Sequence, residues 1–190
     1  LYNMNGEDFR YWQFNKALDD ETCKRILDLG ANKFKDAKVN NNLINKDIRD
    51  SSVIWMNEQW IYDLVFSYMR SANSNSGWNI DVDAAETMQL TKYKKKGFYG
   101  YHKDASGFRA YNKPGNKFLH NKTRKLSMTA LLNDEFEGGG TWFPKYKILS
   151  NPKRVGTATL HPGMVTHLHG ARPIYAGKRY ICVSFMRKNN

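Results

Sequence analysis

The sequence predicts a mostly β protein in which two N-terminal helices pack on a jelly roll of about eight antiparallel strands. Two observations carry this prediction. From Thr87 onward, short β-rich runs alternate with turns that contain Gly or Pro, as is typical of a sandwich or barrel. Before that point, apolar residues recur at helical spacing in two segments. We therefore expect one domain over residues 1–190, with helical support over about 1–84 and the core over about 85–190.

The predicted elements before the core are two helices and one strand. Residues 18–34 open with acidic side chains and keep a helical apolar period, which predicts the first helix. A strand is expected over residues 52–56. Asn57 is expected to cap the second helix, whose apolar stripe runs from Trp60 to Met69.

Seven further strands are predicted in the core. They lie in the segments TMQLTKY, FYGYH, KLSMTALL, TWFP, TATLH, MVTHLH and RYICVSFM, between residues 87 and 186. The segment from Ala105 to Thr123 has no clear period. It is long for a loop, and loops of this length in compact domains are usually functional or mobile.

Composition excludes some classes of protein. No apolar run approaches the roughly 20 residues of a membrane span, and the first residues lack the pattern of a signal peptide. Cys23 and Cys182 are too few for a disulfide framework, so we expect a reducing, cytoplasmic setting. The net charge of +12 favours an acidic partner such as nucleic acid, although no nucleic-acid-binding motif accompanies it.

His102 and Asp104 form an H-x-D pair that can bind a metal ion. Residues i and i+2 of a strand face the same side, so an imidazole and a carboxylate can converge on one ion. With a distant histidine they would complete the two-histidine, one-carboxylate set of non-haem Fe(II) oxygenases. Three histidines compete for that third position: His161, His167 and His169. Strand alternation treats His167 and His169 alike and does not choose between them.

A set of residues at fixed spacing supplies a resemblance to a known family. Before the H-x-D pair the chain has Gln89, Tyr93, Gly97 and Tyr99, and after it Arg124, the turn 138–144 (GGGTWFP), His169, Pro173, Gly177 and Arg179. Counted from His169, the proline, glycine and arginine lie four, eight and ten residues later. Counting from His167 or His161 gives none of these residue types at these offsets. In these features residues 85–187 resemble the Fe(II)/2-oxoglutarate-dependent oxygenases, in particular their prolyl 4-hydroxylase-like branch.

The resemblance implies a double-stranded β-helix (jelly roll) core and an Fe(II) ion held by His102, Asp104 and His169. It further implies 2-oxoglutarate and O₂ as co-substrates, with L-ascorbate as an accessory reductant. The implied reaction hydroxylates an unactivated C–H bond and releases succinate and CO₂.

The resemblance also assigns roles to five other residues. Arg179 would bind the far carboxylate of 2-oxoglutarate, since a guanidinium binds carboxylates bidentately and keeps its charge. Tyr93 and Thr141 would add hydroxyl groups there. Tyr99 and Arg124 would position the target. The prolyl 4-hydroxylases of this family more often carry Lys where this chain has Arg179, which leaves the substrate open.

The implied target is a prolyl residue in a peptide or protein, over which the segment from Ala105 to Thr123 would close as a lid. The same chemistry on a nucleic acid or a free amino acid stays open. So do two classes without catalysis: a metal-binding jelly roll and a basic nucleic-acid-binding module. Arg179 and Tyr93 argue against a purely structural metal, which needs no carboxylate clamp.

Overall fold

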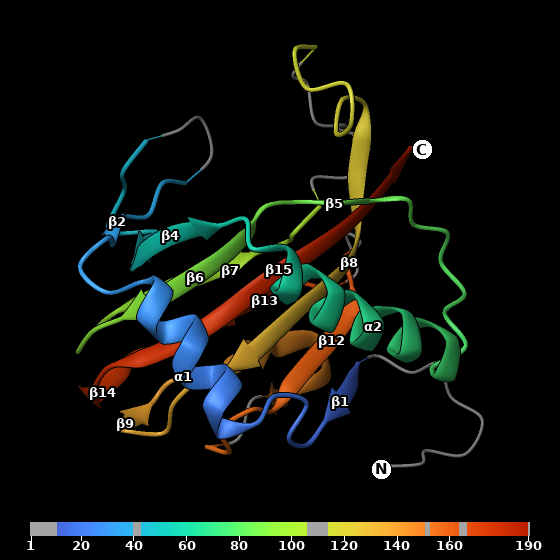
Figure 1. The fold of residues 1–190 in the computed structure, drawn as a ribbon. Coiled ribbons are helices and arrows are strands. Elements are labelled where there is room, and N and C mark those ends of the chain that lie inside the picture. The colour runs from blue at the N-terminus through green and yellow to red at the C-terminus, as the bar shows by residue number, and fades with distance from the viewer. Residues whose placement is uncertain (1–10, 40–42, 106–113, 151–152, 164–166, 190) are drawn as a thin grey trace.

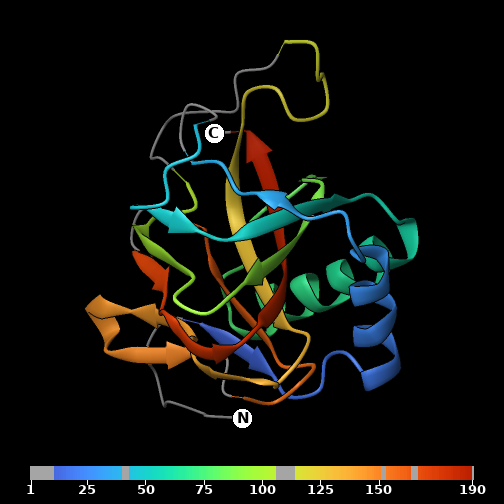
Figure 2. The same cartoon turned by 90° about the vertical axis from the view of Figure 1, so that its left-hand side faces the viewer.

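The structure, a computed structural model, describes residues 11–39, 43–105, 114–150, 153–163 and 167–189. These residues form two large antiparallel sheets, a two-stranded ribbon and two α-helices, and both α-helices lie on the same side of the molecule (Figures 1 and 2). The predicted fold class, mostly β with supporting helices around a jelly roll, is confirmed.

The larger sheet contains eight strands. Its order is β1 (Trp12–Phe14), β12 (Ala158–Pro162), β8 (Lys122–Leu131), β15 (Arg179–Asn189), β6 (Met88–Tyr93), β4 (Ser52–Met56) and β2 (Lys35–Asp36), with β5 (Ala84–Ala85) paired to β15. Its longest strands, β8 and β15, pair along most of their length. Alternation along these strands directs one set of side chains to the helices and the other set to the second sheet.

The smaller sheet contains five strands, and a two-stranded ribbon lies apart from both sheets. The order of the smaller sheet is β11 (Ile148–Ser150), β10 (Thr141–Phe143), β13 (His169–Ala171), β7 (Phe98–His102) and β3 (Arg49–Asp50). The ribbon pairs β14 (Ile174–Gly177) with β9 (Phe136–Gly138), and a short 3₁₀ helix spans Pro144–Tyr146.

The first helix, α1 (Asp20–Leu29), is shorter than predicted and ends at Gly30. Asp19 caps it, because its carboxylate accepts a hydrogen bond from the Thr22 amide at 2.7 Å. The helix follows the predicted apolar period and buries Cys23 and Ile26.

The prediction that Asn57 caps the second helix is wrong. This helix, α2 (Gln59–Asn75), starts after Glu58, which makes no side-chain cap. The Asn57 side chain instead accepts a hydrogen bond from the Tyr62 hydroxyl at 3.2 Å, so it is engaged one turn further along the helix. Neither helix, nor any other in the described part of the chain, has the length and apolar character needed to cross a membrane.

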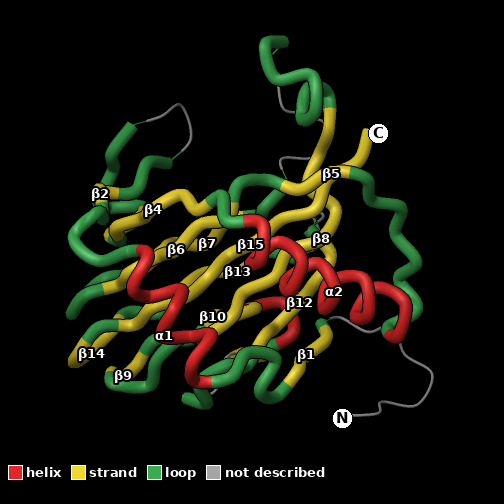
Figure 3. The backbone as a smooth tube through the Cα atoms, viewed as in Figure 1, coloured by secondary structure: helices red, strands yellow, loops and turns green. Residues whose placement is uncertain are grey.

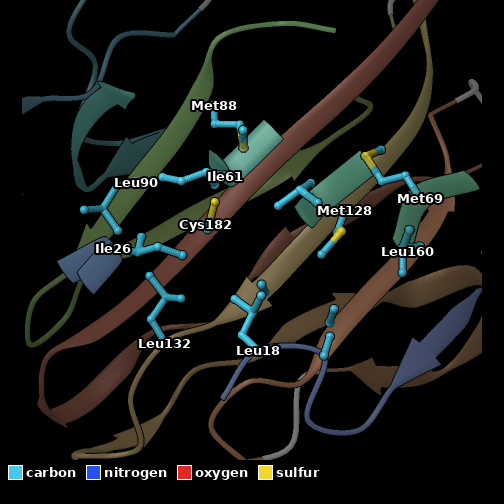
Figure 4. Packing of buried hydrophobic residues seen from close by; sticks show 14 of the residues in the cluster. Leu18, Ile26, Ile61, Met69, Met88, Leu90, Met128, Leu132, Leu160 and Cys182 are labelled. Carbon is cyan, nitrogen blue, oxygen red and sulfur yellow. The ribbon is translucent and has the colours of Figure 1, made fainter. Parts of the chain in front are cut away.

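Helices α1 and α2 lie over the larger sheet (Figure 3), and the main core packs between them (Figure 4). Its residues come from both helices and from the central strands; among them are Ile26, Ile61, Met69, Leu90, Met128, Leu160 and Cys182, each with 1% or less of its surface exposed. Both cysteines are free thiols in this layer, and burial raises the pKa of Cys182 to about 12. The apolar side of the sheet is thus closed by the helices, which leaves its other side for the site.

Replacing Gly156 by alanine is expected to destabilise the protein by about 2 kcal/mol or more. Gly156 has a φ of +78°, and an added Cβ would overlap the carbonyl oxygen of Leu18. Gly77 is a matched control, because its φ is +73° but no atom lies near the Cβ position. Urea unfolding should show a smaller loss for Gly77→Ala, of about 1 kcal/mol. Equal losses would mean that the packing against Leu18 contributes nothing.

Candidate active site

A cavity of about 230 Å³ lies between the two sheets. Strands β6, β8 and β15 of the larger sheet line one side, and β7, β10 and β13 of the smaller sheet line the other. Polar side chains predominate on its walls, in contrast to the apolar layer under the helices. All the predicted site residues except Arg179 line this cavity.

The structure brings His102, Asp104 and His169 together. Strands β7 and β13 are antiparallel neighbours, and His169 lies directly opposite His102. Asp104 follows β7, which ends at His102. The ligand atoms of the three residues all lie within 4.8 Å of one another. Asp104 Oδ1 is 3.7 Å from His102 Nε2, and Asp104 Oδ2 is 3.6 Å from His169 Nε2.

Backbone carbonyls orient both imidazoles as metal ligands. His102 Nδ1 lies 2.9 Å from the Gly100 oxygen, and His169 Nδ1 lies 2.9 Å from the His167 oxygen. Because a carbonyl only accepts hydrogen bonds, the proton is on Nδ1 and the lone pair is on Nε2. This is the usual arrangement of metal-binding histidines. Nitrogen and carboxylate donors in a two-to-one ratio fit Fe(II).

The third histidine at Asp104 is His161, not His167. His161 Nε2 lies 3.7 Å from Asp104 Oδ2. The His167 ring stacks on the outer side of this group, 5.5 Å from the His161 ring and 5.6 Å from that of Tyr146. His161 was one of the three candidate histidines, and the family offsets favoured His169 over it; its place beside Asp104 follows from the packing of the two sheets, because β12 belongs to the other sheet.

Burial favours uncharged imidazoles around an ionised carboxylate. Burial, with repulsion from His169, lowers the pKa of His102 to about 4 and that of His161 to about 3. Burial would raise the pKa of Asp104, but His169, His161 and His102, together with Arg124, hold it well below its usual value. At neutral pH His102, His161 and Asp104 are thus in the protonation states that bind a metal ion.

Arg179 is fully buried without a partner in the described part of the chain. It begins β15 opposite Tyr93 of β6, whose ring lies 5.9 Å from the guanidinium. None of its three side-chain nitrogens makes a hydrogen bond. Burial lowers its pKa to about 10, so the group stays charged at neutral pH. A buried unpaired cation is unfavourable and calls for an anion. Tyr93 and Thr141, its predicted partners, line the cavity.

Arg124 also lines the cavity, but the protein itself holds its guanidinium. Its Nε and Nη2 donate to the Glu86 carboxylate at 2.5 and 2.8 Å, and its Nη1 lies 3.4 Å from the Asp104 backbone oxygen. Glu86 accepts a further hydrogen bond from Arg187 Nε at 2.6 Å. Arg124 therefore braces the loop that carries Asp104. The sequence did not indicate Glu86, which lies 38 residues before Arg124.

Tyr99 and Arg49 form the wall beside His102. The Tyr99 ring stacks on the His102 imidazole, with centroids 3.7 Å apart and planes at 15°. Arg49 lies over the Tyr99 ring at 4.6 Å and donates hydrogen bonds to Ser51 and Gln89. Arg49 was not singled out in the sequence, because it belongs to a two-residue strand with no pattern of its own.

The predicted lid, Ala105 to Thr123, is described only in part, since residues 106–113 lie outside the described residues. Residues 114–121 form turns that project beyond the sheets at the start of β8 (Figure 1). Lys122 and Thr123 belong to β8, so the loop is shorter than predicted.

No family model matches the chain. Its structure is similar to that of the viral collagen prolyl hydroxylase of Paramecium bursaria Chlorella virus-1 in complex with 2-oxoglutarate. The TM-score is 0.71, with 21% identity over 96% of this chain and 97% of that one. In sequence, a putative prolyl 4-hydroxylase of Acanthamoeba polyphaga mimivirus is 23% identical over 184 residues, which cover 92% of this chain and 72% of that protein.

A second group of relatives matches over a shorter segment. Human procollagen-lysine,2-oxoglutarate 5-dioxygenase 2 is 37% identical over 70 residues, 35% of this chain and only 10% of that enzyme. The chain thus matches about a tenth of the length of these larger proteins. The fold is that of the 2-oxoglutarate- and Fe(II)-dependent oxygenases, and the resemblance to their prolyl 4-hydroxylase-like branch is confirmed.

Proposed function

We propose that the protein is an Fe(II)- and 2-oxoglutarate-dependent dioxygenase that hydroxylates a prolyl residue in a peptide or protein and releases succinate and CO₂. One observation supports this most: the ligand group of His102, Asp104 and His169 lies in a cavity that Tyr93 also lines, and the buried, unpaired guanidinium of Arg179 lies 5.9 Å from the Tyr93 ring. A structural metal site has no use for the guanidinium.

His102, Asp104 and His169 would hold the iron. Bound Fe(II) supplies the redox chemistry with O₂ and 2-oxoglutarate. The backbone oxygens of Gly100 and His167 keep each Nε2 lone pair directed inward. The sheets exclude water from the group, since Asp104 and His169 are almost fully buried. Three protein ligands leave positions open on the ion, as the reaction requires.

Arg179 would bind the far carboxylate of 2-oxoglutarate. The N–H groups of Arg179 are already buried without a hydrogen-bond partner. Binding of the carboxylate would therefore give an unpaired charge a charge-assisted hydrogen bond. Tyr93 and Thr141 would add hydroxyl groups, and both line the cavity. L-ascorbate is the proposed accessory reductant.

Tyr99 would position the target against His102, on which it stacks. Arg124 would act through Asp104, because its guanidinium is held by Glu86 and by the Asp104 carbonyl.

The relatives suggest two side chains as the target, proline and lysine, and the charges of the cavity favour proline. Among the described residues that line it, the one acidic group is Asp104, the proposed metal ligand. Arg49 lines it too, and its guanidinium donates hydrogen bonds to the uncharged side chains of Ser51 and Gln89. A lysyl ammonium would be repelled there, whereas a prolyl ring is neutral.

Succinate release measured with three substrates tests the proposal. We expect release with a proline-rich peptide, and a mass increase of one oxygen atom on that peptide. A matched peptide with lysine in place of proline, and an oligonucleotide, should release far less. Succinate release with the oligonucleotide but with neither peptide would refute the peptide proposal. It would indicate instead that the net charge of +12 serves to bind a nucleic-acid substrate.

Replacing His169 by alanine is expected to abolish the metal-to-ligand charge-transfer band that Fe(II) and 2-oxoglutarate produce under anaerobic conditions. Replacing His167 by alanine should keep the band, because its ring lies outside the ligand group. Anaerobic absorption titration measures both variants. If His167→Ala loses the band and His169→Ala keeps it, then His167 and not His169 is the metal ligand.

A further inference from the structure

We propose that His161 is an exchangeable fourth ligand of the metal ion: it binds through Nε2 when 2-oxoglutarate is absent and leaves when 2-oxoglutarate binds. This inference rests on the proposed function and concerns the same site. His161 lies at the end of β12 in the larger sheet, whereas His102 and His169 belong to the smaller sheet. Both sheets therefore contribute histidines to the metal site.

Three imidazoles surround the Asp104 carboxylate at nearly equal distances. Asp104 Oδ2 lies 3.6 Å from His169 Nε2 and 3.7 Å from His161 Nε2, and Oδ1 lies 3.7 Å from His102 Nε2. These distances are too long for hydrogen bonds. Two atoms that share an ion, each at about 2.1 Å from it, lie about 3 to 4 Å apart. The spacing at His161 is thus that of a ligand pair.

The hydrogen bonding of His161 is the same as that of the other two histidines. Its Nδ1 lies 2.9 Å from the Pro162 backbone oxygen, which can only accept. A neutral imidazole has one N–H group, so this contact puts the proton on Nδ1. The Nε2 lone pair then faces the carboxylate, and two acceptors that face each other need a cation between them. A role as hydrogen-bond donor to Asp104 would require the proton on the other nitrogen.

Packing holds the His161 ring in this orientation. Its exposed fraction is 5%. The Phe143 ring meets it edge-on at 5.2 Å, and the His167 ring stacks on it at 5.5 Å. In the sheet, His161 pairs with Ser127 of β8. A side chain held by contacts on several sides is preorganised for one position, so little entropy opposes its binding to the ion.

The number of coordination positions explains why His161 must leave. An octahedral ion has six positions, and 2-oxoglutarate takes two of them. With four protein ligands no position would remain for O₂. The ligand atoms of His102, Asp104 and His169 lie within 4.8 Å of one another, and His161 is not part of this group, so these three would remain bound. His161 thus closes one position to O₂ until the co-substrate arrives.

Mn(II), which is stable in air, is the probe for the exchange. We expect His161→Gln to weaken Mn(II) binding about tenfold without 2-oxoglutarate and to change it little with saturating 2-oxoglutarate. His167→Gln, the matched control, should match the wild type in both states. Glutamine can still donate a hydrogen bond to Asp104, so unchanged affinity in His161→Gln without 2-oxoglutarate would overturn the proposal.

A second measurement uses the wild-type protein alone, so it does not depend on the folding of a variant. The electron paramagnetic resonance spectrum of bound Cu(II) should show coupling to three imidazole nitrogens without 2-oxoglutarate and to two with it. Two nitrogens in both states would refute the exchange and leave the proposed function intact. Failure of the wild type to bind any divalent ion would refute the proposed function itself.

Discussion

Replacement of Arg179 by methionine is expected to abolish 2-oxoglutarate binding and, at the same time, to raise the stability of the ligand-free protein. The guanidinium is fully buried and has no partner among the described residues. The desolvation of this charge therefore lowers the free energy of unfolding of the ligand-free protein. Burial lowers the pKa of Arg179 from 12.5 to about 10. At neutral pH the group is charged in the folded and unfolded states, so the whole cost is present and amounts to about 3 kcal/mol.

Methionine fills a similar space without a charge. The gain in the free energy of unfolding should therefore be about 1–3 kcal/mol, measured by urea unfolding without ligand. Loss of the charge pair should weaken the binding free energy of 2-oxoglutarate by about 2 kcal/mol or more. Calorimetry should therefore show at least a 30-fold lower affinity. The wild type gains stability when 2-oxoglutarate is added, and the variant should not.

Lys178→Met is the matched control for Arg179→Met. Lys178 is the preceding residue, carries the same charge and is exposed. Its replacement should change neither the stability nor the affinity by more than about 0.5 kcal/mol. Destabilisation by Arg179→Met with unchanged 2-oxoglutarate affinity would show that the guanidinium is structural, and would remove the proposed carboxylate clamp.

Replacement of Glu86 by glutamine is expected to destabilise the protein by about 3–5 kcal/mol, since it leaves the buried guanidinium of Arg187 and the partly buried guanidinium of Arg124 without their carboxylate. Arg124 and Arg187 both donate to Glu86. Burial would raise the pKa of Glu86, but the hydrogen bond and charge of Arg124, with Arg187, lower it below the ordinary value of 4.5. The carboxylate therefore stabilises the fold above pH 4.5, and this contribution is lost as the pH falls through its folded pKa.

The difference in stability between the wild type and Glu86→Gln should thus be full at pH 7 and shrink below pH 4.5. Mn(II) affinity should also fall at pH 7, because Arg124 links Glu86 to the backbone oxygen of Asp104. Glu137→Gln replaces an exposed glutamate and should change stability by no more than about 0.5 kcal/mol. A pH-independent loss in Glu86→Gln would mean that the carboxylate charge is not what holds the two arginines.

Local sequence was sufficient for the regular elements. The strand at Ser52–Met56 has the predicted bounds, and β6, β7 and β15 lie within or near their predicted segments. Strands of two or three residues, such as β2, β3 and β5, were not predicted. They have no period of their own and exist because a longer strand pairs with them. Asn57 was misassigned because an asparagine near a helix start can use its oxygen elsewhere.

By itself the sequence determined the fold class and the family resemblance, because both depend on residue order and fixed offsets. The offsets from His169 to Arg179, which span β13, β14 and β15, also led to the prediction of His169 rather than His167 as the ligand. Tertiary structure alone decided which further residues join the site. His161 meets Asp104 only when the two sheets pack together, whereas Glu86 meets Arg124 through the pairing of strands within the larger sheet. Spacing along a chain specifies which side chains share a strand face, whereas contacts between sheets depend on register and packing that no short motif encodes.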